Sequence, residues 1–174
     1  MQAVLISIRP EWCSKIVNGE KAIEVRKTKP KLEPPFKCYI YMTKGFASYA
    51  VANEMWAHNN GGMCVIAEFV CDRIFPIHVF KNGTIQNWNC ENMRDSCVSY
   101  DKMASYVGRG KTGYGWHISD LKVYDTPKAL SEFKPWSREC KFEHLGLAIP
   151  KCQNCHACQV ERAPQSWCYV EQES

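Results

Sequence analysis

The sequence predicts an α+β fold, and three observations support this prediction. The chain has 174 residues, which is enough for one domain with a sizeable core. Hydrophobic residues make up 45% of it and charged residues 23%, as is typical of soluble globular proteins. The expected elements run strand, helix, strand and then several strands separated by glycine-rich turns. This order predicts a mixed β-barrel with short flanking helices.

The first two elements are a buried strand and a short helix. Residues 4–9 are mostly apolar, which predicts a central strand. Pro10 suits the first position of a helix over residues 11–19, and Gly19 is a strong stop signal for that helix.

The second strand is expected at residues 22–27, where apolar and charged side chains alternate. A strand has a period of two, so Ile23 and Val25 point to one face while Glu24 and Arg26 point to the other. An acid and a base therefore lie side by side on one surface. Such a pair is either part of a site or simply the solvated face of a strand.

The middle of the chain predicts further strands and one helix. A basic, proline-rich loop at 28–36 precedes a strand at 38–43, and residues 48–58 have the composition of a helix. Residues 63–77 form one long β-rich run that predicts a bent strand. Residues 79–97 contain an Asn-Gly pair typical of a hairpin turn, followed by a polar stretch.

A short helix at 101–107 leads into a glycine-rich loop that continues as a strand at 111–124. Glycines in this segment allow the backbone to approach another segment or a ligand closely. The spacing matches neither a P-loop nor a dinucleotide-binding motif, so nucleotide hydrolysis of the P-loop kind is not expected.

The formal net charge of +4 permits an anionic partner such as RNA, DNA or a nucleotide without requiring one. Several cations crowd into one early segment that can attract phosphates: Arg26, Lys27, Lys29, Lys31, Lys37 and Lys44. No apolar run is long enough to cross a bilayer, and no basic region precedes the short apolar stretch at the start. We therefore expect a cytoplasmic protein.

The chain contains 11 cysteines, an odd number that argues against a closed disulfide framework. Cys38 and Cys71 lie in apolar runs and are expected to be buried as small hydrophobic residues.

The motif Gly19-x-Lys21-x-x-Glu24-x-Arg26, placed after a strand and a helix, resembles the GxKxxExR motif of ASCH domains of the bacterial and phage type. Segments 113–117 and 164–170 are also similar to parts of ASCH-like proteins. The resemblance covers most of the chain, with insertions at 47–62 and 79–97, and it implies a PUA-like β-barrel over residues 1–150.

In that family the motif lines a cleft that is thought to bind RNA or modified nucleosides. The resemblance therefore implies a ligand contacting Lys21, Glu24 and Arg26, with Arg26 and Lys27 near phosphate and Glu24 near a base edge. Further candidates for ligand binding are aromatic or imidazole side chains that can stack or hydrogen-bond: Trp12, Tyr41, Trp116, His117 and Trp167.

The family also implies two enzymatic alternatives and one non-enzymatic alternative. Some small ASCH-like proteins resemble an amidohydrolase acting on N4-acetylcytidine through a lysine, a threonine and a distant glutamate. Lys21 matches the lysine, whereas Glu24 replaces the threonine nucleophile and would have to activate water instead. A ribonuclease is the second alternative, with His117 and Lys21 as acid and base. A protein-interaction module is the third.

The C-terminal segment 151–174 is expected to combine a metal site with a closing strand on the same domain. Its C-x2-C spacing favours a structural zinc ion held by four thiolates: Cys152, Cys155, Cys158 and Cys168. Reserve ligands for the fourth position are Cys140, His144 and His156. An iron–sulfur cluster and reduced thiols are the alternatives to zinc.

Overall fold

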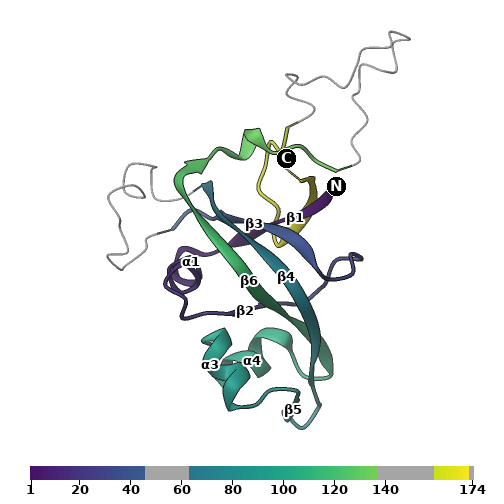
Figure 1. The fold of residues 1–174 in the computed structure, drawn as a ribbon. Helices are drawn as coiled ribbons and strands as arrows, with labels where there is room; N and C mark the ends of the chain where they lie inside the picture. Colours follow the sequence, from purple (N-terminus) through teal and green to yellow (C-terminus); the bar gives the residue numbers. More distant parts are fainter. Residues whose placement is uncertain (46–62, 137–158, 173–174) are drawn as a thin grey trace, which may run out of the picture.

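The computed structural model describes residues 1–45, 63–136 and 159–172. These residues form one seven-stranded sheet with a few short helices (Figure 1). The elements are β1 (Gln2–Ile8), α1 (Pro10–Val17), β2 (Ile23–Arg26), β3 (Phe36–Met42), β4 (Cys64–Val79), β5 (Ile85–Gln86), α3 (Cys90–Ser96), α4 (Tyr100–Val107), β6 (Lys111–Lys128), the 3-10 helix η1 (Leu130–Glu132) and β7 (Trp167–Glu171).

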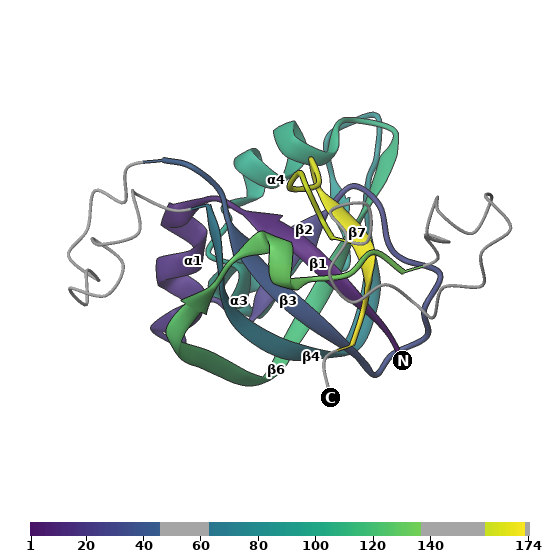
Figure 2. The ribbon, with the colours of Figure 1, turned by 90° about the horizontal axis from the view of Figure 1, so that it is seen from above.

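The sheet runs in the order β2-β6-β4-β3-β1-β7, with β5 paired to β4. β1 and β3 are parallel and the other described pairs are antiparallel, so the predicted mixed α+β class is confirmed. Figure 2 shows a strongly curved sheet. The predicted mixed β-barrel is not confirmed, because the sheet is open: no ladder among the described strands joins β2 to β7. β2 has only four residues and pairs with β6 alone.

The long strands β4 and β6 bend because their pairing is irregular. The register shifts at three places, the last of them between Cys71 and Ile74. Extra residues in one strand of an antiparallel pair increase the local bend and twist. The predicted long strand at 63–77 therefore matches β4, which continues to Val79.

Three apolar clusters hold these elements together. The first packs α1 against one face of β1, β3 and β4, and the second covers the other face of β1 and β3. β1 is thus buried on both faces, as expected for a central strand. The third cluster packs α4 and Trp88 against Ile23 and Val25 of β2 and against the C-terminal end of β4.

Two glycines at the start of β6 allow close packing. A Cβ atom on Gly113 would lie 2.7 Å from Cγ2 of Val107, and one on Gly115 would overlap the ring of Phe75. The close approach predicted for this glycine-rich segment is therefore made to neighbouring side chains of the same chain.

The polar stretch within 79–97 contains a helix that its sequence did not predict. α3 has few apolar residues, and it is capped by Asn89, whose side chain accepts a hydrogen bond of 2.8 Å from the Asn92 amide. The helix predicted at 48–58 lies outside the described residues. Of the helices that the structure describes, none is long and apolar enough to cross a membrane.

Candidate functional site

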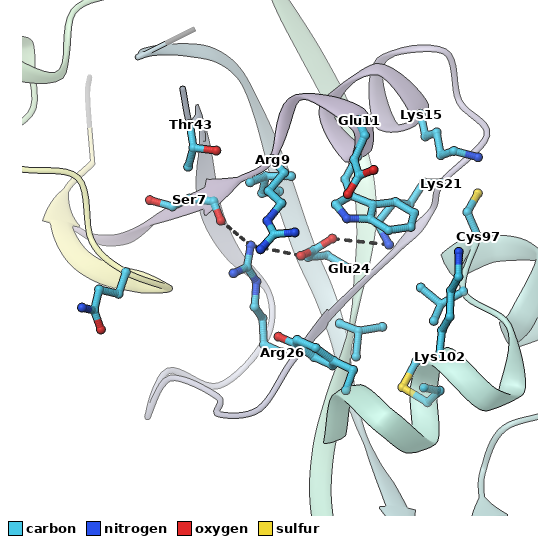
Figure 3. Close-up of a pocket in the computed structure, with 17 residues that line it drawn as sticks. Ser7, Arg9, Glu11, Lys15, Lys21, Glu24, Arg26, Thr43, Cys97 and Lys102 are labelled. Atoms are coloured by element: carbon cyan, nitrogen blue, oxygen red, sulfur yellow. Dashed lines mark hydrogen bonds and ion pairs between the residues drawn. The ribbon is translucent and has the colours of Figure 1, made fainter. Parts of the chain in front are cut away.

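A cleft of about 760 Å³ opens where the end of β1 and helix α1 face β2 and helix α4 (Figure 3). The residues that line it come from segments far apart in the sequence, including Ser7, Trp12, Lys21 and Lys102. The motif from Gly19 to Arg26 runs along this cleft, and Lys21, Glu24 and Arg26 all contribute to its lining.

The alternation predicted for β2 places the charged side chains on the cleft side. Ile23 and Val25 pack into the apolar cluster beneath α4, whereas Glu24 and Arg26 point to the opposite face. Both charged residues are nevertheless buried, with 6% of Glu24 and 8% of Arg26 exposed. A solvated strand face would leave these side chains open to water, so the alternation here produces a buried ionic group.

Lys21 is held by several contacts at the start of β2. Its ammonium nitrogen donates hydrogen bonds to the carbonyl oxygens of Ile23, at 2.8 Å, and Ser96, at 2.7 Å. It also lies 3.4 Å from Oε2 of Glu24 and 5.1 Å from the centre of the Trp12 ring. Burial lowers the pKa of Lys21, and the nearby Glu24 carboxylate partly offsets this effect.

Glu24 lies between two cations. Its Oε2 atom faces Lys21, and its Oε1 atom lies 3.0 Å from Nη2 of Arg26. A carboxylate has about four lone-pair positions, so these two contacts leave it able to accept a further hydrogen bond.

Arg26 connects two strands that do not pair with each other. Its Nη2 atom donates a 2.6 Å hydrogen bond to the Ser7 carbonyl of β1, as well as contacting Glu24. β2 is the first strand of the sheet order and β1 lies near the other end of it. Within the described residues the buried Nε atom of Arg26 has no hydrogen-bond partner.

The cleft is electropositive. Two carboxylates line it, from Glu11 and Glu24, against five cations, which gives a formal net charge of +3. The cations are Arg9, Lys15, Lys21, Arg26 and Lys102. In Figure 3, Arg9 approaches from the end of β1 and Lys102 from α4, while the motif lies along β2 between them. This charge favours an anionic ligand.

Two aromatic rings also line the cleft, Trp12 from α1 and Tyr106 from α4. Tyr106 is 42% exposed, and the ammonium group of Lys27 lies 5.1 Å from the centre of its ring. Lys27 is exposed and does not itself line the cleft, so the structure places it at the rim beside Tyr106.

Sequence reasoning did not select Arg9, Lys102 or Tyr106. A signal for two of them exists, because Lys102 and Tyr106 are four residues apart on α4 and therefore share one helix face. Arg9 follows the last residue of β1 and is the N-cap of α1, immediately before Pro10.

Of the three candidate tryptophans, the structure brings Trp12 into the cleft but not Trp116 or Trp167. Trp116 is opposite Glu24 in the β2–β6 ladder but is 0% exposed, and its ring lies 6.1 Å from that of Trp167 in the core. Trp167 donates a hydrogen bond of 3.0 Å from its indole nitrogen to the Thr28 hydroxyl. Tyr41 is likewise buried, in the second apolar cluster.

His117 lies on the other face of the sheet from Glu24. It is opposite Ile23 in the ladder, and directly opposed residues share a face. Its Nδ1 atom lies 2.6 Å from the Asp72 carboxylate. His117 is therefore not placed to act with Lys21 on one phosphodiester.

The predicted zinc site falls mostly outside the described residues, which do not include Cys152, Cys155 or Cys158 or the reserve ligands Cys140, His144 and His156. Cys168 lies on β7 opposite Leu5 and packs, half-buried, against the second apolar cluster. Within 1–45, 63–136 and 159–172, no three histidine, cysteine or acidic side chains are grouped to hold a metal ion. Zinc binding by the tail stays a prediction.

No protein-family model and no curated protein sequence matches this chain. Several solved structures do resemble it. The ASCH protein of Zymomonas mobilis has 17% sequence identity and a TM-score of 0.54, covering 98% of this chain and 88% of that one.

A serine-to-alanine mutant of the same protein has 16% identity and a TM-score of 0.58, covering 98% and 89% of the two chains. A tyrosine-to-phenylalanine mutant has 18% identity and a TM-score of 0.50, covering 74% and 76%. Likeness at this level of identity concerns the fold, and the described residues of this chain therefore have the ASCH fold that the Lys21, Glu24 and Arg26 motif predicted.

Proposed function

We propose that the cleft binds a nucleoside, a nucleotide or a nucleotide of an RNA strand. The observation that carries this proposal is the buried group Lys21, Glu24 and Arg26 along a cleft whose lining has a formal net charge of +3. Burying three charged side chains lowers the stability of the fold unless they are well paired. Binding a ligand is a function that these buried charges would serve.

The size and lining of the cleft fit such a ligand. Small-molecule sites commonly have volumes of roughly 300–1,000 Å³, and this cleft has about 760 Å³. Trp12 and Tyr106 offer ring faces to a base, a contact worth about 1–3 kcal/mol per base. Arg9 and Lys102 are exposed cations that can approach a phosphate.

Glu24 provides the feature that distinguishes a base from a simple anion. Its carboxylate accepts hydrogen bonds only, and it is held in place by Lys21 and Arg26. An exocyclic amine or a ring N–H of a base is a suitable donor to it. A phosphodiester group lacks such a donor and is repelled by a carboxylate, so Glu24 favours a base at this position.

The proposal is tested by calorimetric titration with nucleosides, nucleotides and a short RNA library at low salt, where phosphate contacts are strongest. Arg9→Ala and Lys102→Ala remove exposed cleft cations without disturbing the buried group, and each should weaken nucleotide binding about tenfold. Lys122→Ala, an exposed cation on β6 outside the cleft, is the matched control and should have no effect. No binding of any probe would contradict the proposal and favour a protein-interaction module.

A second candidate function is hydrolysis of the amide of an N4-acetylcytidine-like nucleoside. The observation favouring it is that burial lowers the pKa of Lys21, whose ammonium nitrogen lies 3.4 Å from the Glu24 carboxylate. A lysine that releases its proton more readily can act as a general base toward water, which attacks the acetyl carbonyl and leaves acetate and cytidine. Incubation with N4-acetylcytidine, followed by chromatography, would show cytidine. Binding without any cytidine release would rule this function out and leave the binding proposal intact.

A further inference from the structure

A second cationic surface lies at the end of the molecule where the turn after β4 meets the start of β6. We call it the tip cluster: Lys81, Arg109 and Lys111. The amide of Gly110 donates a 2.7 Å hydrogen bond to the Val79 carbonyl, which joins the two segments. A guanidinium nitrogen of Arg109 lies 3.8 Å from the place that a Cβ atom would occupy on Gly83. Cγ of Lys81 lies 3.7 Å from the place that a Cβ atom would occupy on Gly110, so the side chains of the two segments lie close together.

No ion pair with a carboxylate of the described residues compensates the tip cluster. The two segments that carry the tip cluster, residues 78–90 and 102–115, contain no aspartate or glutamate, and the acidic residues that flank them in the sequence are Glu91 and Asp101. All three members of the tip cluster are exposed, and none of them forms an ion pair with a carboxylate of the described residues. Three exposed cations without a carboxylate partner form a surface complementary to phosphate groups.

An exposed aromatic ring lies beside the tip cluster. Phe80, which immediately precedes Lys81, is 43% exposed, and its ring packs edge to face on His78 with centres 4.7 Å apart. Exposed rings next to backbone-binding cations are the typical arrangement of surfaces that bind single-stranded nucleic acid.

Helix α4 connects the tip cluster to the cleft. Lys102 and Tyr106 of α4 line the cleft, and Arg109 follows three residues after Tyr106. The eight residues of α4 span about 12 Å at 1.5 Å per residue. At about 3.4 Å per nucleotide in a stacked strand, that distance corresponds to a few nucleotides. Figure 1 shows α4 lying between β2 and the end of the sheet that carries β5.

From this arrangement we infer that the ligand is a single-stranded nucleic acid, with one nucleotide in the cleft and its neighbouring phosphates bound by the tip cluster. The inference rests on the proposed function, which it narrows from nucleotides in general to a strand several nucleotides long. The tip cluster contributes affinity without sequence preference, because it contacts phosphates, while the cleft selects the base.

The test compares two probes, uridine monophosphate and a fluorescent oligouridylate of about 12 nucleotides, a length within the range that such surfaces cover. The first variant combines Lys81→Ala, Arg109→Ala and Lys111→Ala. The matched control combines Arg73→Ala, Lys122→Ala and Arg162→Ala, which removes the same charge from exposed positions elsewhere. Binding is followed by calorimetry for the monophosphate and by fluorescence anisotropy between about 50 and 200 mM salt for the strand.

We expect the tip variant to bind the monophosphate as the wild type does and the strand at least tenfold more weakly. Losing three phosphate contacts on a single strand should lower the salt slope by about 2, at about 0.7 per contact. Phe80→Ala should weaken strand binding about tenfold with the salt slope unchanged. The control variant should retain at least half of the wild-type strand affinity.

Three results would overturn the inference while leaving the proposed function standing: unchanged strand affinity in the tip variant, an equal loss in the control variant, or equal binding of a polyglutamate peptide through the same three side chains. If instead neither probe binds the wild type, or if Lys102→Ala affects neither, the proposed function itself fails. Circular dichroism and urea unfolding of each variant establish that the exposed substitutions leave the fold intact.

Discussion

The buried charge between Lys21 and Arg26 supports a quantitative prediction for Glu24→Gln. The substitution keeps the shape of the side chain and removes its negative charge. Only 8% of the Glu24 side chain is exposed, and it is 3.4 Å from Lys21 and 3.0 Å from Arg26. Removing one partner of a buried ion pair leaves uncompensated charge, which costs about 3–5 kcal/mol.

For a chain of 174 residues, each kcal/mol corresponds to about 2–4 °C in the melting temperature, so we expect a decrease of about 6–20 °C. Urea unfolding measures the free energy directly, and the midpoint should fall without a change in slope. The control is Glu91→Gln, which removes a carboxylate 70% exposed and 4.0 Å from Arg94, and which should leave the midpoint unchanged. A loss below about 1 kcal/mol for Glu24→Gln would refute the reasoning, because it would mean that Lys21 and Arg26 do not depend on this carboxylate.

Burial lowers the pKa of Lys21 below its ordinary value of 10.5, so the unfolded chain binds more protons between the two values and stability should rise with pH in that window. Urea titrations at increasing pH should show this rise in the wild type and not in Lys21→Met. Gly115→Ala should destabilise the fold by about 1–3 kcal/mol in urea, because its Cβ would overlap Phe75. A Cβ on Gly19 meets no atom within 4 Å, so destabilisation by Gly19→Ala would come only from the positive φ of 74° at that position. Tyr106→Ala, at a 42% exposed position, should weaken nucleotide binding and leave the melting curve unchanged; a lower melting temperature with binding retained would assign the ring a packing role. Zinc in the 152–158 segment should appear in elemental analysis, and a chelator should lower the melting temperature; an unchanged curve without metal would remove that proposal.

Local alternation predicted the orientation of the motif correctly. The period of two in residues 22–27 placed Glu24 and Arg26 on one face, and the structure has them there, with Ile23 and Val25 packed beneath α4. The α+β class and the long strand β4 also follow from local pattern. These features depend on neighbouring residues, whose spacing the sequence records directly.

The composition of the cleft wall depends instead on contacts between distant segments. Lys102 and Tyr106 reach the motif only because α4 packs against β2, and single-sequence patterns contain no information on that packing. Trp116 illustrates the reverse case. It shares the face of Glu24, but it is completely buried in the first apolar cluster, whose members come from distant parts of the sequence.

Arg26 makes the architecture of the sheet and the chemistry of the cleft inseparable. Its guanidinium spans the seam between β2 and β1, where no backbone ladder is formed among the described strands. One nitrogen, Nη2, makes both contacts, and the planar guanidinium fixes its orientation, whereas a lysine would present a single rotatable ammonium on a flexible stem. A substitution of Arg26 therefore weakens the contact between β2 and β1 and also changes the ligand-binding surface. A loss of binding in such a variant can be attributed to ligand recognition only after its folding stability has been measured separately.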